Sequence, residues 1–186
     1  MTTDYKPILT LGITMLLLFG CNNNIEDGMN VIASEKVLPT NFQKIAFERQ
    51  ETPYSDYLMS KVVNESVFEE VWDLFNFEDD MPLVGFNEKV VFFIGLHESG
   101  TCPYNIKSMK QSSNNKSITV SLSSTKGPCT SDATPRTFVI EIDKEMAKEI
   151  ESVVIVEGRL ETSVPLAKIY KKDFLTEKSV VLFHWS

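Results

Sequence analysis

The chain of 186 residues lacks the residue types and short motifs that most catalytic sites need. It has two histidines and three cysteines, and it contains no glycine-rich phosphate loop, no HExxH sequence and no CxxC pair. A Ser-His-Asp triad requires a histidine oriented by a carboxylate, and the two histidines lie at the end of a predicted buried strand, His97, and in the C-terminal tail, His184. We therefore expect no enzymatic activity and no metal or cofactor, although paired carboxylates that cleave glycosides would leave no sequence signature.

A basic surface is also missing. Lysine and arginine are scattered along the chain, its formal net charge is -8 and its pI is about 4.8. Proteins that bind nucleic acids usually gather their basic residues on one face, so we expect no nucleic-acid partner. The acidic balance favours solubility, and a basic partner is the second interpretation.

The apolar run near the N-terminus, residues 8–20, is shorter than the roughly 20 residues that a spanning helix needs. Its length is typical of the apolar part of a signal peptide. The run ends in Leu18-Phe19-Gly20-Cys21, which resembles the lipobox of bacterial lipoproteins. The resemblance implies that residues 1–20 are a signal peptide and that lipid, with acyl chains such as palmitate, is attached to Cys21. An uncleaved anchor and an ordinary secretory signal are the alternatives.

This interpretation places the chain in the cell envelope. Each buried CH₂ group contributes about 0.8 kcal/mol, so several acyl chains together hold a soluble domain on a membrane. The membrane is then a partner, and the domain faces outside the cytoplasm.

Two cysteines remain if Cys21 carries lipid. Export would place Cys102 and Cys129 in an oxidising compartment, which favours a disulfide between them. Closing a loop of 26 intervening residues would stabilise the fold by about 3 kcal/mol. Two free thiols, or a catalytic pair of Cys102 with His97, are the alternatives, and neither cysteine has a nearby second ligand that would indicate a metal site.

The pattern of apolar residues predicts a mainly β fold of the α+β class. We expect a single antiparallel β domain, either a sandwich or a partly open barrel, at residues 41–158. Residues 21–40 are predicted to be a flexible linker, and residues 159–186 a C-terminal extension that folds back as an edge strand or is loosely held. Strands are predicted at residues 41–47, 57–63, 90–96, 104–109, 117–122, 136–142 and 152–156.

One amphipathic helix is predicted to begin at Ser66, where Glu69 completes a capping box. Its apolar residues recur at helical spacing: Val67, Val71, Leu74 and Phe75. The continuous apolar run at residues 90–96 indicates a strand buried on both faces, and the helix would cover one of them. Trp72 and Phe75 could instead form a ligand platform. A second, short helix is expected at residues 144–150 after a cap at Asp143.

Two loops between the predicted strands contain the paired cysteines. Loops that are fixed on a β scaffold commonly present binding sites, because little ordering is needed when a partner binds. Thr101, Pro103 and Tyr104 are our candidates for partner contact, with Cys102 and Cys129 as support. The alternative is that a disulfide only stabilises two long loops.

The order of these elements resembles the C-terminal domain of the PrcB family, named for a subunit of a bacterial surface protease complex. The resemblance rests on five segments: Trp72-Asp73-Leu74-Phe75, Val84-Gly85-Phe86, the strand at residues 90–95, the loop Thr101-Cys102-Pro103-Tyr104 and the strand at residues 137–142. It implies a non-catalytic exported domain that associates with or stabilises a partner, with a protease as one candidate.

The chain departs from this family at its loops. Cys102-Pro103 stands in place of two glycines, and Cys129 is an addition. The Thr-x-x-Tyr loop also resembles that of chagasin-type inhibitors of cysteine proteases. Together these features predict a membrane-anchored lipoprotein that acts as a binding or accessory module for an envelope protein. A small envelope hydrolase and a purely structural envelope protein are the alternatives.

Overall fold

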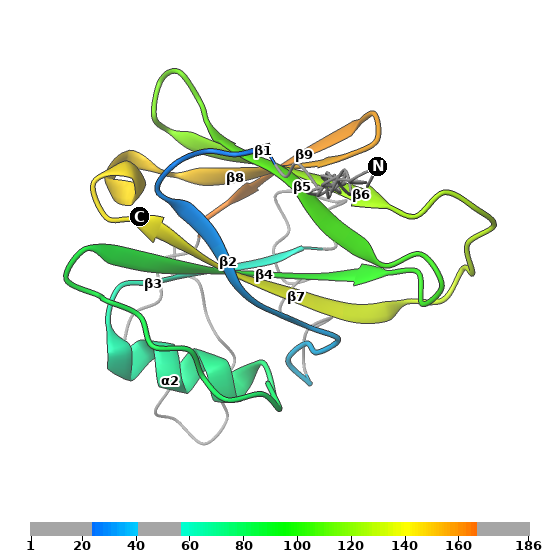
Figure 1. Ribbon diagram of the computed structural model, residues 1–186, viewed down its shortest axis with the longest axis horizontal. Helices are drawn as coiled ribbons and strands as arrows, with labels where there is room; N and C mark the ends of the chain where they lie inside the picture. The colour runs from blue at the N-terminus through cyan, green and yellow to red at the C-terminus, as the bar shows by residue number, and fades with distance from the viewer. Residues whose placement is uncertain (1–23, 41–56, 167–186) are drawn as a thin grey trace, which may run out of the picture.

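A computed structural model describes residues 24–40 and 57–166 and arranges them in two β-sheets and one α-helix (Figure 1). Sheet A has the strand order β1-β5-β6-β8-β9. Its strands are β1 (Asn24–Ile25), β5 (Tyr104–Gln111), β6 (Ser117–Ser124), β8 (Ser152–Glu157) and β9 (Leu160–Pro165). Sheet B has the order β2-β7-β4-β3. Its strands are β2 (Met29–Glu35), β7 (Thr134–Asp143), β4 (Lys89–Glu98) and β3 (Leu58–Val62).

The sheets face each other as an open sandwich and do not close into a barrel, which confirms the predicted fold class. Most neighbouring strands are antiparallel, and β4 pairs with β7 from Lys89↔Asp143 to Glu98↔Thr134. Two pairs are parallel, β1 with β5 and β6 with β8. The main core fills the space between the sheets and includes Phe92, Ile94, Leu96, Met109, Ile118, Val120, Ile140, Ile142 and Ile155.

A second core lies on the outer face of sheet B, beneath the helix α2 (Glu65–Leu74). Phe93 points to this side of β4 and is fully buried against the helix residues Phe68, Trp72 and Phe75. The prediction that this strand is buried on both faces is therefore confirmed. The aromatic residues of the helix pack against the sheet, as the first interpretation of them expected.

The helix begins slightly earlier than its sequence indicated. Asn64 is the N-cap, and its side-chain oxygen accepts a hydrogen bond from the backbone N–H of Val67. The predicted capping box at Ser66 is therefore wrong, because Asn64 already provides the acceptor that the free amides at the helix start require.

The segment predicted to be a flexible linker, residues 21–40, instead contains β1 and β2. β2 pairs with β7 from Met29↔Ile142 to Glu35↔Thr137, and Met29 and Val31 pack on the main core. The expectation of little structure is wrong for residues 24–35. The segment begins with polar residues, but the apolar stretch that follows them forms β2 at the edge of sheet B.

The short second helix is a turn of 3-10 helix, η1 (Met146–Glu149). Asp143 does not cap it, because the N-cap residue is Glu145 and no side chain makes a capping hydrogen bond there; the Asp143 carboxylate instead accepts a hydrogen bond from the Lys89 ammonium group at 2.6 Å. β9 confirms an edge strand at the start of the predicted C-terminal extension.

Several predictions lie outside the described residues. They are the signal peptide at residues 1–20, the lipidation of Cys21, the strand at residues 41–47, and the rest of the extension at residues 167–186 with His184. Within residues 24–40 and 57–166, no helix is long and apolar enough to cross a membrane.

Candidate functional site

Two loops connect the sheets at one end of the sandwich (Figure 1, right). The loop at residues 99–103 leads from β4 in sheet B to β5 in sheet A, and the loop at residues 125–133 leads from β6 back to β7. The two loops cross between the sheets in opposite directions, and both lie at this end of the sandwich. We call them together the paired loops.

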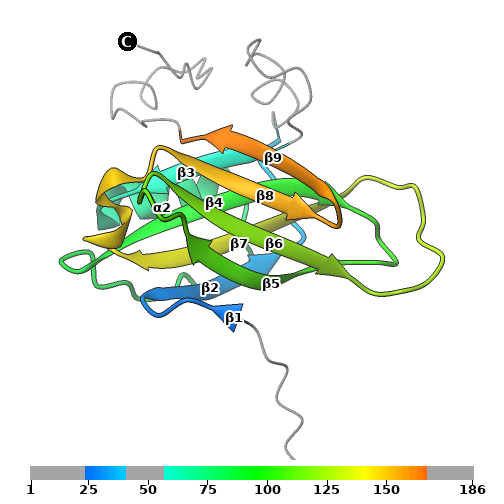
Figure 2. The same ribbon diagram turned by 90° about the horizontal axis from the view of Figure 1, so that it is seen from above.

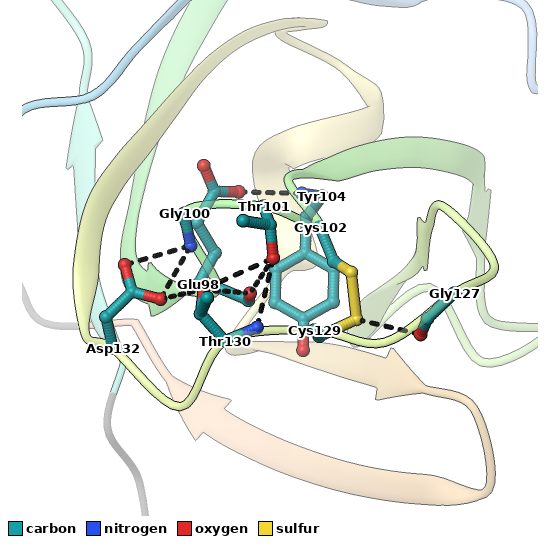
Figure 3. The surroundings of a disulfide bond; sticks show 10 residues. Glu98, Gly100, Thr101, Cys102, Tyr104, Gly127, Cys129, Thr130 and Asp132 are labelled. Atoms are coloured by element: carbon teal, nitrogen blue, oxygen red, sulfur yellow. Dashed lines mark hydrogen bonds between the residues drawn. A yellow bond between two sulfur atoms is a disulfide. The ribbon is translucent and has the colours of Figure 1, made fainter.

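A disulfide joins the paired loops, as predicted (Figure 3). The sulfur atoms of Cys102 and Cys129 lie 2.00 Å apart, and the two Cα atoms 5.5 Å apart. The Cys102 side is buried, whereas Cys129 lies on the exposed loop. Since the sulfur of Cys102 is bonded to another sulfur, it is not a free nucleophile, and the alternative of a catalytic pair with His97 is excluded.

A carboxylate forms a second, non-covalent link between the same loops. Both oxygens of Asp132 accept a hydrogen bond from the backbone N–H of Gly100 at 3.1 Å, and the hydroxyl of Thr130 donates to one of them (Figure 3). The hydroxyl of Thr134 donates to the other at 2.6 Å. These donors stabilise the charged form and lower the pKa of Asp132 well below its ordinary value. Gly100 has no room for a side chain, because a Cβ would lie 2.5 Å from an oxygen of Asp132.

Three hydroxyl groups extend this link across the loops. The oxygens of Ser99, Thr101 and Thr130 lie 3.1 to 3.3 Å from one another, and the hydroxyl of Thr101 accepts the backbone N–H of Thr130 at 3.0 Å. Each hydroxyl carries one proton, and that of Thr130 is donated to Asp132. The three hydroxyls therefore find their hydrogen-bond partners within the paired loops, and these bonds hold the loops together.

A buried ion pair lies beneath the paired loops. The Glu98 side chain is fully buried at the end of β4, and Arg136 of β7 contacts one of its oxygens through two nitrogens, at 2.7 and 2.9 Å. The other oxygen accepts the backbone N–H of Tyr104 at 2.6 Å. One carboxylate thus connects the first residue of β5 to both central strands of sheet B.

Tyr104 has a partly structural position. Its ring packs against the main core, and its hydroxyl donates to Glu157 at 3.2 Å. Glu157 also accepts the hydroxyl of Tyr57 at 2.6 Å, so this carboxylate joins residues next to β3 and β5. Burial, followed by the nearby charge of Glu157, raises the pKa of Tyr104 to about 12.

The three residues predicted to contact a partner are brought to the same loop but differ in exposure. Thr101 is exposed, whereas Pro103 and Tyr104 are half-buried. Asp132, Glu98 and the groups that donate to them were not predicted from the sequence. Glu98 could have been found, because it continues the series of alternate residues of β4 that face the main core. A charged side chain at such a position requires a partner.

The described part of the chain, residues 24–40 and 57–166, contains no group of three or more His, Cys, Asp or Glu side chains placed to bind a metal ion. Comparison of the chain with known protein families, curated proteins and solved structures gave no significant match. The paired loops are thus defined by their geometry alone: an exposed loop, residues 125–133, and a mostly half-buried loop, residues 99–103, linked by a disulfide, a carboxylate and three hydroxyls.

Proposed function

We propose that this chain is an exported, membrane-anchored lipoprotein whose β domain is a non-catalytic binding or accessory module for another envelope protein. The observation that carries the proposal is the double link between the paired loops. A disulfide and a hydrogen-bonded carboxylate hold the same two loops, and each link fixes a different part of them.

Fixing a loop before binding lowers the entropy that a partner must overcome. The exposed residues between the fixed points are free to contact a partner, because no hydrogen bond within the described residues uses the side chains of Lys126 or Ser131. Together with Thr101 and Pro103 they form the contact surface that we propose. Tyr104 contributes only the exposed part of its ring.

A protease is the partner that the resemblance to the PrcB family suggests. The lipid anchor at Cys21 would concentrate the module at the membrane, where an envelope protease acts on exported chains. An accessory role is compatible with the site. The paired loops present side chains for contact, while the hydroxyl groups of Ser99, Thr101 and Thr130 bond to one another.

A crosslinked pull-down from native membranes tests the proposal with a matched pair of variants. Ser131→Arg places a bulky charge on the paired loops, and Ser113→Arg places the same charge on the exposed β5–β6 turn. We expect one partner to be captured by the wild-type chain and by Ser113→Arg but lost with Ser131→Arg, with thermal unfolding unchanged in all three.

The identity of the captured protein, determined by mass spectrometry, then tests the choice of a protease. Capture that is equal with all three baits would place the contact elsewhere on the domain. Failure of every bait to capture a partner would contradict the binding role and favour a purely structural one.

A further inference from the structure

The outer face of sheet A, which points away from sheet B, is broad and almost uncharged. The residues that point outward from β6, β8 and β9 are half-buried or exposed: Ser117, Thr119, Ser121, Ser123, Ser152, Val154, Val156, Glu161 and Ser163. They form rows across the strands, such as Thr119↔Val154↔Ser163. Among the described residues no helix or strand covers this face, which is turned to the viewer in Figure 2.

The opposite side of the molecule carries the net charge of the chain. Residues 64–88, which include α2 and the loop after it, contain eight acidic residues and no basic one. Their formal charge of -8 equals that of the whole chain, so the other residues together are neutral. Since α2 packs on the outer face of sheet B, this acidic layer and the outer face of sheet A lie on opposite sides of the sandwich (Figure 1).

The proposed anchor is close to sheet A. Cys21 precedes Asn24, the first residue of β1, by three positions, and β1 forms the edge of sheet A beside β5. Three residues span at most about 11 Å. Lys107 and Lys110, both exposed, lie on β5 next to this edge.

We infer that the surface of a phospholipid bilayer covers the outer face of sheet A, with the acidic layer turned away from the membrane. The inference rests on the proposed lipid anchor at Cys21. A tether of this length holds the domain against the headgroups, and the charge distribution selects its orientation. Anionic headgroups repel the acidic layer, whereas the edge beside the tether is neutral, since Lys107 and Lys110 offset the exposed Glu26 and Asp27. Hydroxyl side chains on a flat face can donate hydrogen bonds to the phosphates.

Cysteine accessibility tests this orientation with two variants that make the same substitution. Ser163→Cys lies on β9, the strand of sheet A farthest from the tether, and Ser66→Cys lies on α2; both serines are exposed. The full-length lipidated chain is inserted into preformed vesicles of phosphatidylethanolamine and phosphatidylglycerol. The rate of reaction with a membrane-impermeant maleimide is measured before and after the vesicles are dissolved in detergent.

We expect Ser163→Cys to react about tenfold more slowly on vesicles than in detergent, and Ser66→Cys to react at nearly the same rate in both. Protection must extend to β9 if the whole face is covered. Equal rates at the two positions on floating vesicles would overturn the orientation while the anchor stands. A chain that does not float with the vesicles refutes the anchor, and the orientation is refuted with it.

A longer tether provides a second test. Insertion of a Gly/Ser segment of about 20 residues between Asn23 and Asn24 adds a flexible spacer of about 25 Å. We expect the rate at Ser163→Cys on vesicles to rise toward its value in detergent. A rate that remains low would overturn the role of the short tether in setting the orientation.

Discussion

The two sheets of this protein differ in how many of their faces are buried. Sheet B packs against sheet A on one side and against α2 on the other, whereas sheet A is covered on one side only by the described residues. The sequences of the strands reflect this difference in burial. β4 is a continuous apolar run at residues 90–96, and β6 alternates between serine or threonine and a buried aliphatic residue. The pattern of apolar residues along a segment thus indicates both that it is a strand and how many of its faces are covered.

The comparison also explains how the geometry of the paired loops arises within this fold. Both loops pass from one sheet to the other, so the disulfide and Asp132 fix the separation of the two sheets at one end. Glu98 performs the same task inside the sandwich, because its carboxylate pairs with Arg136 in sheet B and also accepts the backbone N–H of Tyr104 in sheet A. The site is therefore a consequence of how the layers are connected.

Phe93→Ala should give the largest effect, because it opens a cavity between sheet B and α2. The side chain is fully buried, and its ring centre lies 5.1 Å from that of Phe75 and 5.8 Å from that of Phe68. We expect the free energy of unfolding to fall by about 3–5 kcal/mol. Urea unfolding followed by tryptophan fluorescence measures it, and a loss below about 1 kcal/mol would contradict a tightly packed second core.

Replacement of both cysteines, Cys102→Ser with Cys129→Ser, should come next. The double substitution removes the covalent bond between the paired loops, and we expect a loss of about 3 kcal/mol in the free energy of unfolding. Chemical denaturation of the variant and of the reduced wild-type chain should agree. If both are as stable as the oxidised chain, the hydrogen bonds of Asp132 are sufficient to fix the loops.

Gly95→Ala should have an intermediate effect on sheet B. A Cβ at this position would lie 2.6 Å from a methyl carbon of Leu38 and 3.2 Å from the ring of Phe75. We expect a loss of about 1–3 kcal/mol, because the leucine must move. Gly85→Ala is the control, since nothing lies within 4 Å of its Cβ. Equal thermal shifts for both variants would refute the close packing at Gly95.

Thr119→Ala examines the uncovered face of sheet A and should have little effect. Its side chain points outward from β6 and is half-buried between neighbouring strands. We expect the free energy of unfolding to change by less than about 0.5 kcal/mol. A loss as large as that of a core residue would mean that another part of the chain covers this face, and the contrast between the two sheets would disappear.

The smallest expected effect is a local dependence on pH at the paired loops. The pKa of Asp132 is lowered in the folded chain, so its contribution is fully present above the ordinary value of 3.8 and is lost as the pH falls through the lowered value. The amide proton of Gly100, followed by NMR, should therefore shift only below pH 3.8. In Asp132→Asn the same amide should show no titration there. A transition of the wild-type amide at or above 3.8 would contradict the lowered pKa.

Much of the fold follows from local patterns, and the errors have a common cause. The run at β4 and the spacing of apolar residues in α2 correctly indicated a strand covered by a helix. β2 was missed because the stability of its polar and short apolar stretch depends on β7, which is more than one hundred residues away in the sequence. Pairing at such a distance leaves no periodic signal within the strand itself.

The site could be predicted only in part for the same reason. The expectation of export to an oxidising compartment pairs Cys102 with Cys129, so their bond could be anticipated. The function of Asp132 depends on the amide of Gly100, which belongs to another loop, and no property of its own neighbours indicates this contact. Tyr104 was correctly placed at the loop, but its contact with Glu157 depends on β8.

The fixed points of the paired loops also determine which segment tolerates added length. Residues 125–128 lie between the end of β6 and Cys129, are exposed, and include a glycine whose φ of 155° suits few other residues. Doubling the length of such a loop adds only about 0.6 kcal/mol of closure entropy. Foreign peptides could therefore be inserted here, with Cys129, Thr130 and Asp132 holding the two loops in place behind them.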